Sequence, residues 1–380
     1  MSSPKIIIAT VARPSGTTGV QTHFNTFLGY LRQQGTESDL VTPFSYLKPL
    51  ALAVFAVRSV VGPLSPSFSV WWFEKWHYLF LQRALRRVLK RQGPAIIYAQ
   101  CPLSAKAALE TRAGLEQRVV LVAHFNVSQA EEWTNLLGLP RGGLVYEAIR
   151  HREAEVLPRL DGIVHASSFV RDTIEDVIPA VCSVPALTLP NFVSSPAADE
   201  ESGAGNDLIS IGTLEARKNQ AYLLRVLAEA KNLGRFLGLT VIGDGPSRAQ
   251  LEALAETLGV EQQVRFLGYQ KDARRFLPGH RVFVHAALTE TFGIALIEAM
   301  ASGLPICAGP TGGIPEVFTD GIEGLYWDLN DPHAGALKLI SLLEDQELQS
   351  RMSQAGRSRF ADHFETNKCA GRLHEFLLQC

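Results

Sequence analysis

Short runs rich in β-branched residues alternate with amphipathic segments along this chain, and the alternation occurs twice over. In the first half the runs are 5–12, 38–43, 95–100, 119–124 and 161–167, and in the second half they are 207–213, 238–244, 264–268, 281–286, 304–309 and 323–328. Such alternation is typical of βαβ units, whose strands form a parallel sheet covered by helices. The pattern therefore predicts an α/β fold of two Rossmann-like, doubly wound domains facing each other across a cleft.

The 380-residue length suits two domains of about 150–200 residues each. Between the two sets of runs, the chain is rich in proline, serine, glycine and acidic residues, which is typical of a linker. We therefore predict a first domain over 1–188, a linker over 189–206 and a second domain over 207–364. Residues 365–380 have the apolar spacing of a helix, and we expect this helix to cross back onto the first domain.

Bulk properties indicate a soluble, cytoplasmic protein. No charge-free apolar run of 18 residues occurs, and the start MSSPKIIIAT resembles a first strand rather than a signal peptide. Five scattered cysteines without a C-x-x-C pair indicate neither a disulfide framework nor a zinc site. Residues 1–190 carry 19 basic and 14 acidic side chains, whereas the remainder carries 17 and 24, so the two halves suggest different partners.

Doubly wound folds bind ligands beyond the carboxyl ends of their strands, so residues that follow strands are site candidates. Gly16 and Gly19 follow the first strand and would let a backbone approach phosphate or sugar oxygens, although a flexible loop is the alternative. His124 ends the run 119–124 and could hydrogen-bond a sugar hydroxyl or share a developing charge. The alternative for His124 is a hydrogen bond to a neighbouring backbone group.

Arg217 and Lys218 lie between a strand and a helix in the second half. Two adjacent cations there oppose the helix dipole, which indicates a negative partner such as a diphosphate; a solvated pair is the alternative. The segment GDGPSR carries Arg248 where a dinucleotide fingerprint has its third glycine, which argues against a dehydrogenase. Because no D-x-D triplet occurs, we predict no metal site, and the two cations could hold a diphosphate instead.

Glu290 and Glu298 bracket the start of a helix predicted over 292–302 and closed by Gly303. Their eight-residue spacing spans up to about 12 Å in a helix, whereas hydrolase carboxylates lie about 5–9.5 Å apart. One long ligand is therefore favoured over an acid pair: a nucleotide sugar with Glu290 at the sugar, the N–H groups of Phe292 and Gly293 at the phosphates, and Glu298 at the ribose.

A second glycine-containing turn follows the next strand. Gly312 and Gly313 precede another helix start and are expected to add exposed N–H groups beside the same ligand.

The segment E-T-F-G-I-A-L-I-E from Glu290 to Glu298, followed by EAMASGLPICAGPTGGIPEV, resembles the E-x7-E signature of the retaining GT-B glycosyltransferases of family 4, the glycosyl transferases group 1. The likeness extends over GTLEARKN, VIGDGP and VRFLGY, hence most of 207–330. It is looser in the first half, through the Gly16 and Gly19 loop, His124 and SSFVRD. Two positions depart from the pattern. Thr213 stands where many members have arginine, and the segment PNFVS lacks the usual glycine after Pro-Asn.

This resemblance implies a UDP- or GDP-sugar donor, no cofactor, and retention of configuration by front-face attack, in which the leaving phosphate accepts the acceptor's proton. Arg217 and Lys218 would bind the diphosphate, Glu290 the donor sugar and Glu298 the ribose. His124 would contact the sugar from the first domain.

The Gly16 loop would line the phosphate or acceptor side, and the first domain would bind a glycan or lipid-linked acceptor in polysaccharide biosynthesis. The alternatives are another GT-B sugar-nucleotide enzyme, such as an epimerase, or a non-catalytic nucleotide-sugar-binding partner. No nucleic-acid partner is expected.

Residues 47–91 are unusually apolar and aromatic, and end in a basic segment. One predicted helix face holds Leu81, Leu85, Val88 and Leu89, the other holds Arg83, Arg86, Arg87, Lys90 and Arg91, and Trp71, Trp72, Trp76 and Tyr78 lie just before. This combination fits peripheral binding at an anionic membrane surface on the inner face, as expected for a lipid-linked acceptor. The alternative is an ordinary helix packed on its sheet with a solvated basic face.

Overall fold

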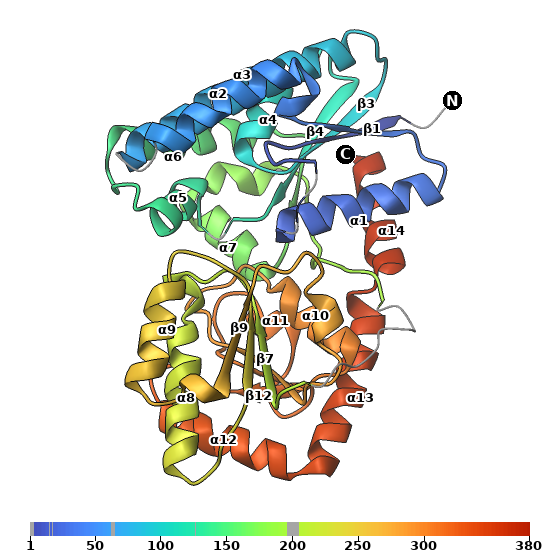
Figure 1. The fold of residues 1–380 in the computed structure, drawn as a ribbon. Coiled ribbons are helices and arrows are strands. Elements are labelled where there is room, and N and C mark those ends of the chain that lie inside the picture. Colours follow the sequence, from blue (N-terminus) through green and yellow to red (C-terminus); the bar gives the residue numbers. More distant parts are fainter. Residues whose placement is uncertain (1–3, 15, 17, 62–64, 126, 196–204) are drawn as a thin grey trace. The chain divides into compact units, whose positions relative to one another are not determined.

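The computed structural model describes residues 4–14, 16, 18–61, 65–125, 127–195 and 205–380 (Figure 1). The chain forms two compact units, Met1–Asn191 with Thr366–Cys380, and Phe192–Glu365. The break between the units falls at residues 191 and 192, and the segment 196–204 of the expected linker lies outside the described residues.

The first unit is built on a parallel sheet in the order β2-β1-β3-β4-β5-β6. Its strands are β1 (Lys5–Ala9), β2 (Ser38–Val41), β3 (Ala95–Ala99), β4 (Gln117–Ala123), β5 (Gly162–His165) and β6 (Ala186–Thr188). All the runs predicted in this half form strands; four are a little shorter than predicted, and β4 starts two residues earlier and ends one residue earlier than its predicted run. The prediction missed β6, because three residues at a sheet edge are too short for an alternating pattern.

The second unit is also built on a parallel sheet, in the order β12-β11-β10-β7-β8-β9. Its strands are β7 (Leu208–Ile211), β8 (Leu239–Ile242), β9 (Val264–Gly268), β10 (Val282–His285), β11 (Ile306–Ala308) and β12 (Gly324–Tyr326). The direction of winding reverses between the neighbours β7 and β10, as it does between β1 and β3 in the first unit. These reversals are where open α/β sheets hold ligands. The predicted doubly wound α/β class is confirmed.

Helices cover both sheets (Figure 1). Those of the first unit are α1 (Gly19–Gln33), α2 (Lys48–Val61), α3 (Pro66–Leu89), α4 (Pro102–Leu109), α5 (Gln129–Leu137), α6 (Leu144–Val156), α7 (Ser168–Val177) and α14 (Thr366–Gln379). Those of the second are α8 (Gln220–Asn232), α9 (Arg248–Thr257), α10 (Ile294–Ser302), α11 (Ile314–Val317), α12 (Pro332–Glu344) and α13 (Gln346–His363). No described helix has the length and apolar character needed to span a membrane.

The helix α1 begins at a capping box. Thr18 accepts a hydrogen bond from the backbone N–H of Gln21, and the Gln21 side chain accepts one from the backbone N–H of Thr18. These two bonds satisfy backbone donors that a helix start leaves unpaired. The face holding Phe24, Phe27 and Leu31 is fully buried, as the apolar spacing predicted. The helix therefore starts at Gly19, and the Gly16 segment stays outside it.

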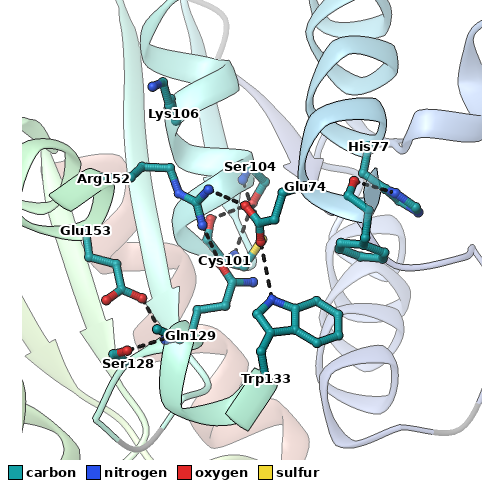
Figure 2. Close-up of polar contacts among 12 residues, drawn as sticks. Glu74, His77, Cys101, Ser104, Lys106, Ser128, Gln129, Trp133, Arg152 and Glu153 are labelled. Atoms are coloured by element: carbon teal, nitrogen blue, oxygen red, sulfur yellow. Dashed lines mark hydrogen bonds and ion pairs between the residues drawn. The ribbon is translucent and has the colours of Figure 1, made fainter. Parts of the chain in front are cut away.

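A buried polar network joins α3, α5 and α6 (Figure 2). Arg152 of α6 forms an ion pair with Glu74 of α3, and both side chains are about nine-tenths buried. The indole of Trp133 donates to Glu74 at 3.3 Å, and the Arg152 guanidinium donates to the Gln129 side chain at 3.1 Å. Charges buried in this way stay in place because each has a partner. The network therefore fixes α3, α5 and α6 against one another.

Candidate functional site

The strongest cluster of predicted site residues lies at the reversal point of the second sheet. Arg217 and Lys218 close a 3-10 turn over Ala216–Lys218 that follows β7, and Glu290 follows the neighbouring strand β10. The two loops are joined directly, since the N–H of Leu288 donates to the carbonyl of Arg217 at 2.8 Å. Adjacent parallel strands thus bring together residues that are 72 positions apart.

Glu290 is buried and holds its charge through two neighbours. Its Oε2 pairs with the ammonium of Lys218 and lies 3.3 Å from Nε2 of His285. Burial of Glu290 opposes ionisation, but the Lys218 charge and His285 outweigh it and hold the pKa of the carboxyl well below its usual value. Burial lowers the pKa of His285, so this imidazole is neutral at pH 7. Glu290 is therefore a fixed carboxylate acceptor at any physiological pH.

Arg217 is also paired within the unit. Its guanidinium donates to Glu215 at 2.7 Å and to the backbone carbonyl of Thr289 at 3.0 Å. Within this unit the two cations already have negative partners, the carboxylates of Glu215 and Glu290, so their charge alone does not require a ligand. The alternative of a freely solvated pair is wrong, since both side chains are more than four-fifths buried.

The turn at Gly312 and Gly313 supports Glu290 from behind. The N–H of Gly313 donates to the backbone carbonyl of Glu290 at 2.9 Å, so this amide, expected to be exposed to a ligand, is already used by the protein. Gly312 has φ +57°, and a Cβ there would lie 2.1 Å from the same carbonyl oxygen. Only glycine fits such a contact. The turn therefore positions Glu290.

The helix bearing Glu298 starts two residues later than predicted, at Ile294, with Gly293 at its N-cap and φ +90°. Phe292 is buried and packs edge-on against Phe364 at 5.6 Å, so its side chain anchors the loop. Burial raises the pKa of Glu298 to about 7, although the charge of Arg274 works against the shift. Near neutral pH, Glu298 therefore exchanges between acid and carboxylate.

In the first unit, His124 follows β4 and its Nε2 lies 3.3 Å from Oε1 of Gln100. The imidazole of His23 packs edge-on against it, with ring centroids 4.8 Å apart. Burial lowers the pKa of His124 well below its usual value, and the nearby His23 adds to the shift. A neutral ring of this kind fits the hydrogen bond predicted for His124.

Gly16 lies outside α1 and Gly19 is its first residue, both solvent-exposed. A Cβ on Gly16 would lie 2.2 Å from the Gln21 side chain that forms the capping box.

His285 and Glu215 were missed by sequence reasoning. His285 ends the run RVFVHA in the same way that His124 ends VVLVAH, so its position after a strand was a usable signal. Glu215 gave no such signal, because its pairing depends on the fold of the turn.

Two doubly wound units, one with cations and a carboxylate at the reversal point of its sheet, place these groups where such sheets bind ligands. Family comparison identifies the class of protein. Residues 17–194 match the model described as Glycosyltransferase Family 4, and residues 195–359 match that described as Glycosyl transferases group 1. The chain therefore belongs to the GT-B glycosyltransferases of family 4, group 1, as the E-x7-E resemblance predicted.

The relatives include N-acetyl-alpha-D-glucosaminyl L-malate synthase of Bacillus anthracis, 34% identical over 34% of this chain and 34% of the relative. They also include a GDP-mannose-dependent alpha-(1-6)-phosphatidylinositol monomannoside mannosyltransferase of Mycobacterium tuberculosis, 28% identical over 57% of this chain and 61% of the relative. The chain matches less than two thirds of the length of these relatives.

Among solved structures, sucrose-phosphate synthase from Thermosynechococcus elongatus matches with a TM-score of 0.76 and 17% identity, over 99% of this chain and 98% of that one. Anabaena HepE in complex with UDP and glucose matches with a TM-score of 0.69 and 15% identity, over 99% of both chains. At such identities these likenesses establish the fold.

Proposed function

We propose that the protein is a retaining, metal-independent glycosyltransferase that moves a sugar from a UDP- or GDP-sugar to a glycan or lipid-linked acceptor in polysaccharide biosynthesis. The observation that carries the proposal is the convergence of Lys218, Arg217 and Glu290 at the reversal point of the second sheet. The relatives, an N-acetyl-alpha-D-glucosaminyl L-malate synthase and a GDP-mannose-dependent mannosyltransferase, support the same class of reaction.

Lys218 and Arg217 bind the donor diphosphate in this proposal. A lysine ammonium has three N–H donors, so Lys218 can keep Glu290 and still donate to a phosphate oxygen. Ionised Glu290 accepts hydrogen bonds from hydroxyls of the transferred sugar, and Glu298 accepts from the ribose. The leaving phosphate accepts the acceptor's proton, so the chain supplies position and charge stabilisation. His124 supplies a neutral hydrogen bond.

Donor binding tests this assignment. Thermal stabilisation is measured with a panel of UDP- and GDP-sugars, first on the unmodified chain and then on Lys218→Ala. Charged hydrogen bonds contribute about 1.5–3 kcal/mol, so we expect the variant to bind the stabilising donor roughly tenfold to a hundredfold more weakly. Arg351→Ala, which removes a cation from an exposed pair on α13, is the matched control. Equal donor affinity in both variants would count against the site.

Acceptor dependence separates transfer from the two alternatives. An epimerase would release nucleotide and free sugar without any acceptor, and a non-catalytic partner would bind the donor without turnover. Nucleotide release that requires an added acceptor, with loss of turnover in Glu290→Gln, supports transfer. Release at the same rate without an acceptor would favour the epimerase.

For the lipid-linked acceptor, we propose that the outer face of α2 lies on an anionic membrane. Leu50 and Leu52 of α2 are about half exposed and Trp71 of the adjoining α3 is 42% exposed, an unusual concentration of large apolar groups. The basic residues of α3 expected to be solvated are exposed, while Leu81, Leu85 and Leu89 pack into the core.

Liposome flotation tests this surface. Binding to vesicles containing phosphatidylserine at physiological salt, lost in Leu52→Glu, supports it. Leu144→Glu, on an exposed leucine of α6, is the control. Failure of the unmodified chain to float would refute the membrane proposal.

A further inference from the structure

A pocket of about 660 Å³ lies in the first unit at the carboxyl end of β1. Residues 11–13, in the loop after β1, line it together with Phe44, side chains from α2 and α3, and the last residue of α5. Its volume falls within the about 300–1,000 Å³ typical of small-molecule sites. It also lies beside the reversal point between β1 and β3, where such sheets hold ligands.

Two cations line this pocket, Arg13 and Arg58, and none of the described lining residues carries a carboxylate. Among the described residues, neither arginine has a carboxylate within ion-pairing distance. Arg58 is held rigidly: its Nε donates to the Ser69 hydroxyl at 2.9 Å, and its guanidinium lies 5.0 Å from the ring centroid of Phe73. Burial lowers the pKa of Arg58, and no carboxylate in the described part of the chain pairs with it to offset this effect. An oxyanion would supply a negative charge there and match the guanidinium fork.

His77 gives the pocket a neutral hydrogen-bond acceptor. Its ring is stacked between Phe55 and Phe73, with centroids 4.0 and 3.8 Å away. Its Nδ1 lies 2.9 Å from the backbone carbonyl of Phe73. A carbonyl only accepts, so Nδ1 carries the proton and Nε2 keeps a lone pair. Burial lowers the pKa of His77 to about 3, and the charges of Arg58 and Arg13 add to the shift.

We propose that this pocket binds the acceptor through a carboxylate or phosphate attached to a hydroxylated ring, as in a sugar acid or a sugar phosphate. Arg58 and Arg13 bind the oxyanion, Nε2 of His77 accepts a ring hydroxyl, and Phe44 and Phe55 pack against the apolar face of the ring. The identification of the ligand as the acceptor rests on the proposed glycosyl transfer. The assignment of an oxyanion site to this pocket does not depend on it.

Direct binding tests the pocket with three probes: D-glucuronate, D-glucose 6-phosphate and D-glucose. Calorimetry on the full chain is expected to give saturable binding of at least one anion and at least tenfold weaker binding of neutral D-glucose. The better-bound anion identifies the carboxylate or the phosphate. Arg58→Gln, which can keep the bond to Ser69, and Arg13→Gln, in an exposed segment, are each expected to weaken anion binding by about tenfold or more.

Arg83→Gln is the matched control, because it removes the same charge from an exposed position on α3. The proposal would be overturned if neither anion showed saturable binding at concentrations up to about 10 mM. Equal binding of D-glucose, or an equal effect of Arg83→Gln, would overturn it as well.

The donor site is tested separately in the same variants with UDP and GDP. If Lys218→Ala, and not Arg58→Gln, abolishes binding of D-glucose 6-phosphate, the phosphate occupies the donor site and the pocket assignment is wrong. If nucleotides fail to bind while Arg58-dependent anion binding persists, the donor assignment fails and the pocket stands.

Discussion

Replacing Gly312 with alanine would displace the backbone of Glu290 without changing any polar group of the site. The added Cβ would lie 2.1 Å from the Glu290 carbonyl oxygen, and real Cβ contacts are not shorter than 3.0 Å. The two backbones must therefore separate by about 1 Å. A shift of that size in a positioned group can reduce a rate about a hundredfold.

The stability cost can be separated from the positioning cost by a matched variant. Gly312 has φ +57° and Gly321 has φ +79°, but a Cβ on Gly321 meets nothing within 4 Å. Both substitutions place alanine in the left-handed region, at about 1–2 kcal/mol each. For a unit of this size we expect each kcal/mol to lower Tm by about 2–4 °C. Only Gly312→Ala adds the contact with Glu290.

Calorimetric unfolding and sugar transfer, measured with the donor found in the panel, check this reasoning. We expect both variants to remain folded at 25 °C, Gly321→Ala to keep near-normal transfer, and Gly312→Ala to lose about a hundredfold. Transfer by Gly312→Ala at the rate of Gly321→Ala would refute the claim that this turn positions Glu290.

Three further predictions concern buried carboxyls. Burial raises the pKa of Glu153 from 4.5 to about 7. Between these pH values the folded unit binds a proton that the unfolded chain has lost, so the free energy of unfolding falls by about 3 kcal/mol as pH rises across that window. In unfolding followed by tryptophan fluorescence, Glu153→Gln should remove most of this pH dependence. Glu74→Ala leaves Arg152 buried and unpaired, so it should cost about 3–5 kcal/mol in denaturant unfolding, whereas Glu347→Ala, in an exposed pair, should leave stability unchanged. UDP affinity should fall as pH drops below about 7, because Glu298 then gains a proton. The Glu298→Gln variant should bind UDP weakly at every pH. A UDP affinity of the unmodified chain that does not change with pH would contradict the role of Glu298 at the ribose.

Local patterns were enough to predict every described strand except β6 and to place Arg217, Lys218 and Glu290 after strands, because both depend on residues near one another in sequence. They were not enough to predict which groups pair. Lys218 reaches Glu290 only because β7 lies next to β10, and strand order is a property of the whole sheet. The Gly313 amide shows the same limit: its partner, the carbonyl of Glu290, lies on another loop.

The first unit contains residues from both ends of the described chain. Leu373 and Leu377 of α14 are fully buried, and Cys380 lies against Gly162 of β5. During synthesis these residues are added after the whole second unit, which takes about 10–35 s at about 5–20 residues per second. The first sheet must therefore wait with an uncovered apolar surface while the second unit is made. This waiting period gives molecular chaperones a defined interval in which to act on the nascent chain.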